Sequence, residues 1–179
     1  MLPYHVTDSV VLRLLQEHHA PELFALMERN RPYLRQWLSW LDGTTEVEHS
    51  RLFIRECLKS FLDTTAFVCG IWHHHQLCGV IGHNDINWDD RSVNIGYWLA
   101  ENQQGHGIIT RCCRVFIDHA FNEYGLDRVE LHIATGNEKS QTIAYRLGFT
   151  RTGVIKEAEW LYDHFLDHTV NVLHRPASP

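Results

Sequence analysis

The chain has 179 residues, of which 16 are Lys or Arg and 22 are Asp or Glu, so its formal net charge is −6 at pH 7. This length fits one domain whose core needs no disulfide or structural metal, and we expect a single domain over residues 1–179. The mildly acidic net charge argues against a nucleic-acid-binding protein. No segment of the sequence approaches the ~20 consecutive apolar residues of a membrane span.

The first third of the sequence predicts one strand followed by helices. A β-branched and leucine-rich run over residues 10–15 is typical of a strand. Pro21 and Pro32 each stand where a helix can begin, and Asp42-Gly43 is a stop signal. The expected helices cover residues 22–30, 33–41 and 46–62.

The rest of the sequence alternates between strand and helix patterns. Two apolar runs joined by a histidine-rich segment predict a hairpin, and Gly125 and Gly148 are expected to end two amphipathic helices. The expected strands cover residues 66–72, 77–82, 92–100, 128–135, 149–156 and 165–173, and the expected helices cover residues 105–124 and 137–147. Two βα units among hairpins imply both parallel and antiparallel strand pairs. The predicted fold class is therefore α/β, with a mixed sheet flanked by helices.

The most distinctive local feature is the turn Gln104-Gly105-His106-Gly107, which follows a strand ending near Leu99 and precedes an amphipathic helix. Glycine lets a backbone approach a phosphate closely, and the first amides of a helix have no internal partner. The peptide dipoles of the helix favour an anion at the same place. The spacing is neither that of an NTPase P-loop nor that of a Rossmann dinucleotide site. Taken alone, the pattern leaves open a phosphate site or a tight turn without a ligand.

Two segments together resemble the motifs of the GNAT acetyltransferases. The strand and turn resemble motif A, with Asn102 where that motif usually has Arg or Gln. Further along, the segment from Asn137 to Gly148-Phe149 resembles motif B, in which Asn opens a helix beside the pantetheine of the cofactor. Asn137 also suits the N-cap of a helix. The resemblance implies the GNAT fold, with a central mixed, mostly antiparallel sheet, and acetyl-CoA as the cofactor.

Further patterns resemble the RimJ/RimL group of ribosomal-protein N-terminal acetyltransferases. They are the run Ile95-Gly96-Tyr97-Trp98, the aromatic pattern from Asn30 to Trp40, and the segment from Lys156 to Trp160. In that group a Glu and a Ser at the positions of Glu159 and Ser140 are proposed as general base and acid, and the resemblance assigns those roles here. The tyrosine that many relatives use as the acid is replaced by Ala144. Tyr145, one step further around the helix, is not expected to take its place.

The resemblance also implies a set of cofactor contacts. They are Trp98, Leu99, Gln104, Gly105, His106, Gly107, Ile108, Ile109, Asn137 and Ser140. Backbone amides near the end of the strand over residues 95–99 are expected to hold the acetyl oxygen. No metal site is expected, because the histidines of residues 73–75 point in alternate directions at a hairpin tip.

The expected reaction moves the acetyl group to a primary amine by direct attack in a ternary complex, with the N-terminal α-amine of a protein such as a ribosomal protein as the acceptor. Two alternatives stay open: a small amine (a polyamine, antibiotic or metabolite) as the acceptor, or a non-catalytic acyl-CoA-binding sensor. The five cysteines form no C-x-x-C pair and no signal-peptide pattern is visible, so we expect a cytoplasmic protein. Dimers are common in the family, so the resemblance allows a homodimer, but the sequence does not determine the oligomeric state.

Overall fold

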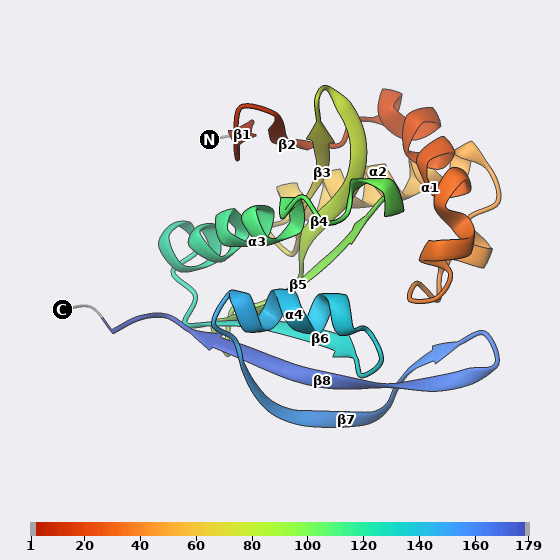
Figure 1. Cartoon of the computed structure of the whole chain (residues 1–179). Coiled ribbons are helices and arrows are strands. Elements are labelled where there is room, and N and C mark those ends of the chain that lie inside the picture. The colour runs from red at the N-terminus through yellow and green to blue at the C-terminus, as the bar shows by residue number, and fades with distance from the viewer. Residues whose placement is uncertain (1–2, 178–179) are drawn as a thin grey trace.

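One continuous sheet of eight strands runs through the structure, a computed structural model that describes residues 3–177. Its strand order is β1-β2-β3-β4-β5-β6-β8-β7 (Figure 1). The strands are β1 (Tyr4–His5), β2 (Val10–Leu14), β3 (Phe67–His73), β4 (Gln76–Asn87), β5 (Ser92–Leu99), β6 (Arg128–Ala134), β7 (Thr150–Leu161) and β8 (His164–His174). The helices are α1 (Ala20–Leu34), α2 (Val47–Leu62), α3 (Ile108–Asp118) and α4 (Glu138–Arg146). The predicted α/β class with a mixed, mostly antiparallel sheet is confirmed.

The pairing of β5 with β6 is the parallel pair in this sheet, and it is short. It joins only Ser92–Asn94 to Arg128–Glu130, while β5 stays paired with β4 from residue 92 to residue 99. The second half of β5 therefore leaves β6 and presents a free edge. A parallel pair requires a crossover connection, and α3 provides it (Figure 1).

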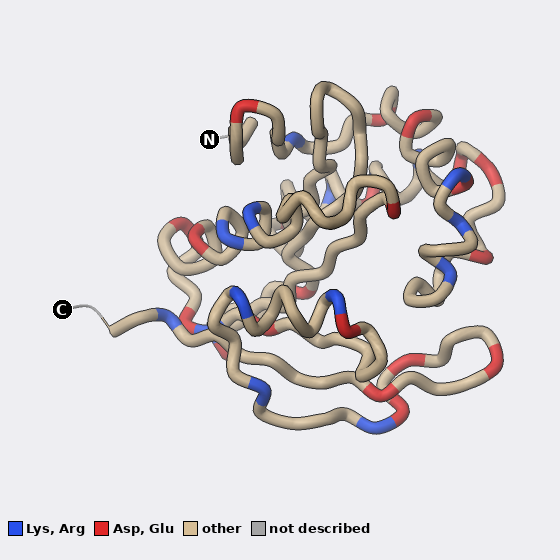
Figure 2. The backbone as a smooth tube through the Cα atoms, in the orientation of Figure 1, with Lys and Arg blue, Asp and Glu red and all other residues tan. Residues whose placement is uncertain are grey.

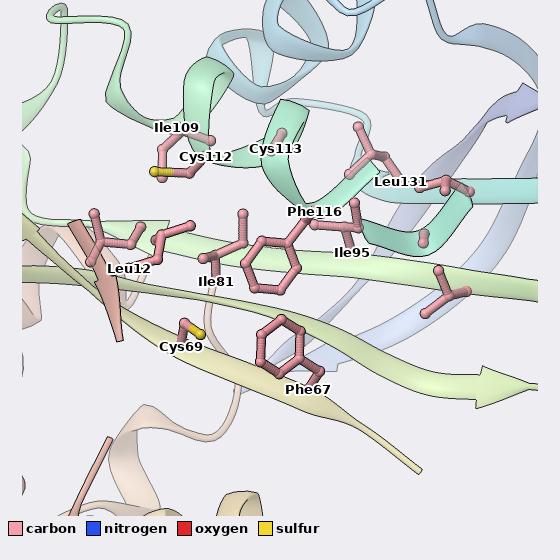
Figure 3. Close-up of a cluster of buried hydrophobic side chains, with 14 of the residues drawn as sticks. Leu12, Phe67, Cys69, Ile81, Ile95, Ile109, Cys112, Cys113, Phe116 and Leu131 are labelled. Atoms are coloured by element: carbon pink, nitrogen blue, oxygen red, sulfur yellow. The ribbon is translucent and has the colours of Figure 1, made fainter. Parts of the chain in front are cut away.

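Two apolar layers cover the two faces of the sheet. Alternate residues of a strand point to opposite faces. On β4, Val80 packs with α1 and α2 on one face, and Ile81 packs with α3 on the other. Figure 3 shows the second layer, in which Phe116 of α3 stacks on Phe67 of β3 with ring centroids 5.1 Å apart. These layers explain why nearly all of β3 is buried, and they fix α3 over the sheet.

The helix expected over residues 22–30 lies within α1, but the separate helix expected over residues 33–41 is wrong, because α1 continues through Pro32 and ends at Leu34. Pro32 has no amide hydrogen to donate to the Glu28 carbonyl and its ring crowds that carbonyl, but only two helical residues follow it, so the cost is confined to the last turn. Leu34 is 2% exposed, so continuing the helix buries its side chain. Beyond it the chain forms turns, in which the Trp37 amide bonds to the Leu34 carbonyl at 3.0 Å.

Other elements differ from the expectations at their ends. The first hairpin turns at His74 and His75, which both have positive φ (49° and 65°), so its loop has two residues and not four. The helix expected over residues 105–124 begins at Ile108, and its last part is a π-helical turn over His119–Glu123. Strand β7 extends to Leu161, beyond the expected end at residue 156. Its pairing with β8 shifts register between Ile155 and Glu159, which residue periodicity does not reveal. Strand β1 was not expected.

Candidate active site

A cleft of about 560 Å³ opens where β5 leaves β6. Its walls come from the end of α1, the second half of β5, the turn before α3 and the start of α4. The lining residues are Tyr33, Leu34, Trp37, Leu38, Tyr97, Trp98, Leu99, Gln103, Gln104, Gly105, Gly107, Ile108, Ile109, Thr110, Asn137, Lys139, Ser140, Thr142, Ile143 and Arg146. Every predicted cofactor contact lines this cleft except His106. The two resemblance motifs, separated in sequence, therefore meet in one cavity.

The turn before α3 exposes a row of unused backbone amides. Gly105 and Gly107 have φ of 80° and 68°, in the left-handed region that glycine adopts without strain. Within residues 3–177 no hydrogen bond uses the amides of residues 105–110, and the first amide satisfied is that of Arg111, 3.2 Å from the Gly107 carbonyl. Free amides at a helix N-terminus, together with the helix dipole, suit a phosphate or diphosphate.

Two amides on the free edge of β5 also point toward the cleft. The Ala100 amide bonds to the Cys78 carbonyl of β4 at 2.8 Å. In an antiparallel ladder the amides of alternate residues bond to the same neighbouring strand, so the backbone amide of Trp98 also points toward β4. The amides of Tyr97 and Leu99 therefore face the opposite side, where β6 has moved away. This edge can donate hydrogen bonds to a carbonyl oxygen placed in the cleft.

The start of α4 forms the facing wall. Oδ1 of Asn137 accepts a hydrogen bond from the Ser140 amide at 3.2 Å, so the predicted N-cap is confirmed. Ser140 lines the cleft with its hydroxyl free of any hydrogen bond within the described part of the chain. Ala144 is buried, whereas Tyr145 is 83% exposed and points to solvent, as expected.

Sequence reasoning missed the cations of α4. The Lys139 ammonium donates to Oε1 of Gln104 at 2.7 Å and lies 5.5 Å from the centre of the Tyr33 ring. Arg146 lines the cleft from the other end of the helix. Figure 2 shows basic residues at both ends of α4. The signal that could have found them is a pair of cations seven residues apart, and so on one face, of the helix that resembles motif B.

The predicted base lies just outside the cleft lining. Oε1 of Glu159 accepts a hydrogen bond from the Ser39 hydroxyl at 2.5 Å, and Oε2 lies 3.3 Å from Nε2 of His168. Ser39 follows Leu38, which lines the cleft and whose carbonyl accepts a hydrogen bond from the Tyr162 hydroxyl at 2.5 Å. The β7–β8 hairpin is thus fastened to the turn after α1. The structure brings Glu159 to the border of the cleft, but Glu159 and Ser140 do not share its wall.

Acidic side chains and cationic or amide donors lie at opposite ends of the region formed by the cleft and the outer part of the β7–β8 hairpin. Figure 2 shows acidic residues gathered on the outer part of the β7–β8 hairpin; they are Glu157, Glu159, Asp163 and Asp167. The Lys156 ammonium bonds to Asp167 at 2.6 Å and holds the pKa of that carboxyl below its usual range. The phosphate turn and α4 supply amides and cations, so one end suits an anion and the other a cationic group.

Cysteine and metal chemistry find no support in the described residues. The cysteines are free, and burial raises the pKa of the Cys112 thiol to about 12, so it stays protonated. Residues 3–177 contain no group of three or more His, Cys, Asp or Glu side chains placed to hold a metal ion. Nor does any helix in that range combine the length and apolar character needed to cross a bilayer.

The family model for an acetyltransferase (GNAT) domain matches residues 9–150. The chain belongs to the GNAT acetyltransferase family. The ribosomal-protein-serine acetyltransferase of Escherichia coli (strain K12) is 31% identical over 90% of both chains, and YdaF of Bacillus subtilis (strain 168) is 32% identical over 94% of this chain and 91% of its own. These GNAT relatives and the cleft agree that the protein is an acetyl-CoA-dependent N-acetyltransferase.

Two solved GNAT structures show the same fold. RimL, a ribosomal L7/L12 α-N-protein acetyltransferase in complex with coenzyme A, is 27% identical with a TM-score of 0.90, over 94% of this chain and 96% of that one. The microcin C7 self-immunity acetyltransferase MccE, in complex with acetyl-CoA and AMP, is 26% identical with a TM-score of 0.92, over 97% and 96%. Coenzyme A carries a diphosphate, and the unused amides of residues 105–110 fit that group.

Proposed function

We propose that this GNAT enzyme acetylates the N-terminal α-amine of a ribosomal protein, with Glu159 as the base that receives the amine's proton. The observation that carries the proposal is the position of this carboxylate, fixed between Ser39 and His168 beside the turn that borders the cleft. The relatives named above for ribosomal-protein acetylation support the same acceptor. Such an acceptor also implies a cytoplasmic enzyme.

The strength of the base favours an α-amine over a lysine side chain. An α-amine with a pKa near 7.8 is roughly 15% neutral at pH 7, while a lysine amine near 10.4 is roughly 0.04% neutral. The additional deprotonation costs about 3.5 kcal/mol. Glu159 is a single, partly exposed carboxylate with a histidine neighbour. A carboxylate of this kind, acting through a water molecule, suits the less basic amine.

Each protein group has one task in the proposed transfer. Glu159 takes a proton from the incoming ammonium and passes it to solvent, so that the neutral nitrogen can bond to the acetyl carbon. Glu159 then takes the second proton, which this nitrogen loses once the bond has formed. The amides of Tyr97 and Leu99 hold the acetyl oxygen as its charge grows. The carbon–sulfur bond breaks with its electron pair on sulfur, and the Ser140 hydroxyl passes a proton to that sulfur while regaining one from solvent. The products are the acetylated amine, a free thiol and one proton released to solvent, so atoms and charge balance.

The separation of acidic from basic groups supports a different side of entry for each of the two substrates. The amides of residues 105–110 and the side chains of Lys139 and Arg146 would hold the phosphates of coenzyme A. The acidic outer hairpin would attract a protein N-terminus, which is cationic before it loses its proton. The family resemblance allows a homodimer, and light scattering of the purified enzyme would determine its oligomeric state.

A panel of acceptors tests the acceptor class. The enzyme is incubated with acetyl-CoA and one amine at a time: peptides with a free N-terminal Ser or Ala, the same peptides with a blocked N-terminus and an internal lysine, spermidine, and an aminoglycoside. Thiol release and mass spectrometry report transfer. We expect the free N-terminal peptides to be acetylated on the α-amine. Transfer only to spermidine or the aminoglycoside would contradict the proposal in favour of a small-amine acceptor.

A further inference from the structure

One buried hydroxyl beside the cleft is left without a partner. The side chain of Tyr97 lines the cleft from β5, yet its oxygen is buried and makes no hydrogen bond within the described residues. Buried polar atoms in folded proteins are nearly always paired, so each exception calls for an explanation. A hydroxyl that stays unpaired in the ligand-free enzyme is a candidate for a bond that forms only when the cleft is filled.

The surroundings of Tyr97 narrow the choice of partner. Burial raises the pKa of the Tyr97 phenol and Cys113 of α3 raises it further, while the Ser140 hydroxyl, close enough to interact with the phenol but outside hydrogen-bond geometry in the ligand-free enzyme, lowers it. Cys113 is a weak acceptor that faces the core. Ser140 is therefore the polar partner within reach, and its own hydroxyl has no hydrogen bond within residues 3–177.

We propose that Tyr97 is a positioning residue: in the loaded enzyme its O–H donates to Oγ of Ser140 and directs the Ser140 hydrogen at the sulfur of the cofactor. This inference rests on the role proposed for Ser140. A serine hydroxyl has one hydrogen and two acceptor lone pairs. When Tyr97 occupies one lone pair, the Ser140 hydrogen is free to point into the cleft.

The environment of Tyr97 suits a donor that keeps its proton. Because burial disfavours the charged phenolate, Tyr97 stays neutral throughout the reaction and contributes orientation only. The α4 position at which many GNAT enzymes carry a tyrosine is Ala144, which has no hydroxyl to offer. Tyr97 lines the cleft from β5 and Ser140 lines it from α4, so the proposed relay would run from Tyr97 through Ser140 to the sulfur.

A double-mutant cycle tests the inference. Tyr97→Phe, Ser140→Ala and the double variant are compared with the native enzyme, using acetyl-CoA and a peptide with a free N-terminal serine. If the native enzyme does not use that peptide, spermidine replaces it, because the relay concerns the sulfur and not the amine. Tyr145→Phe is the matched control, since its side chain points from α4 into solvent.

We expect Tyr97→Phe to lower kcat about three- to tenfold, the usual worth of one neutral hydrogen bond, with the KM for acetyl-CoA unchanged. The same change on the Ser140→Ala background should have no further effect. Because the variant removes an unpaired buried hydroxyl, its Tm without ligand should equal or exceed that of the native enzyme. Tyr145→Phe should change none of these values.

Several results would overturn the inference. If Tyr97→Phe keeps the native kcat while Ser140→Ala is slow, Tyr97 has no role in the transfer and the proposed function stays intact. Equal losses on both backgrounds show that Tyr97 does not act through Ser140. A lower Tm with a raised KM shows a purely structural role. Native rates in Ser140→Ala remove the role of Ser140 and the relay together, while acetyl transfer by the native enzyme still identifies the acceptor.

Discussion

The Lys139 ammonium and Oε1 of Gln104, 2.7 Å apart, join the start of α4 to the turn before α3 across the cleft that both residues line. In the ligand-free enzyme this cation therefore lies beside the unused amides of residues 105–110. A diphosphate placed on those amides would offer the ammonium a charged acceptor in place of a neutral amide oxygen, and charge-assisted hydrogen bonds are the stronger kind. Lys139 would then exchange Gln104 for the phosphate.

Lys139→Met is expected to weaken coenzyme A binding about three- to fivefold, because an exposed ion pair contributes roughly 0.5–1 kcal/mol. The loss should shrink as salt is raised. Titration calorimetry with coenzyme A measures the affinity, and pantetheine, which lacks the diphosphate, serves as a second ligand. Lys59→Met on α2 is the control variant. Equal weakening for both ligands would show that Lys139 does not act on the phosphates.

Gly107→Ala should damage both the fold and the phosphate site. The left-handed φ of 68° costs a residue with a Cβ atom about 1–2 kcal/mol, which should appear in the free energy of unfolding. We also expect weaker coenzyme A binding, by about tenfold, if strain shifts the amides away from the phosphates.

Gly125→Ala separates these two effects. Gly125 has a similar φ of 66° and open space around an added Cβ, but it lies at the far end of the helix that Gly107 begins. This variant should lose similar stability in urea unfolding and keep native affinity for coenzyme A. Loss of affinity in both variants would trace the effect to general destabilisation.

Glu159→Gln distinguishes an enzyme from an acyl-CoA sensor. A general base typically contributes about 10²–10⁴-fold to the rate, so kcat should fall by that order while coenzyme A affinity persists. Glutamine keeps an oxygen that can accept from Ser39, so the hairpin contact survives the change. Glu157→Gln, an exposed neighbour on the same strand, is the control and should keep its kcat. Native turnover in Glu159→Gln would place the base elsewhere.

The parts of the site that were predictable from sequence are local. Two glycines, a helix start and an Asn N-cap each act within a few residues, and the structure places the phosphate turn and Asn137 as expected. The resemblance supplied Glu159 and Ser140, but their surroundings were not predictable. The Ser39 contact to Glu159 joins residues 120 apart in sequence, and it depends on the irregularity in β7.

The fold shows the same division between local and distant causes. Strand and helix types followed from periodicity, because burial on one face repeats along each element. The prediction of a second helix after Pro32 was wrong because a proline suits a helix start but can also stand in the last turn of a helix. The burial of Leu34 decides between the two, since it favours continuing α1 to that residue. The separation of β5 from β6, which creates the cleft, is a property of strand pairing that no single segment encodes.

Burial of His83 makes the fold sensitive to acid. His83 is fully buried, and this burial lowers the pKa of its imidazole to about 3, from an ordinary value of 6.5. The neighbouring His119 lowers it further, while the bond from Nε2 to the Phe116 carbonyl at 2.9 Å acts in the opposite direction. Between pH 6.5 and about 3 the unfolded chain binds a proton at this residue and the folded chain does not. Stability is therefore complete above pH 6.5 and falls as the pH is lowered.

Below pH 6.5 the free energy of unfolding should fall by up to about 1.4 kcal/mol per pH unit from His83 alone. Urea unfolding at pH 7, 6 and 5, for example, measures this slope. His83→Phe is the matched variant, because the new ring can pack against Phe67 and Phe116, and the Phe116 carbonyl keeps the bond from the His119 amide. We expect a shallower acid slope in this variant, with the part due to His119 remaining. Identical slopes in the two proteins would mean that His83 is protonated in the folded state as readily as in the unfolded chain.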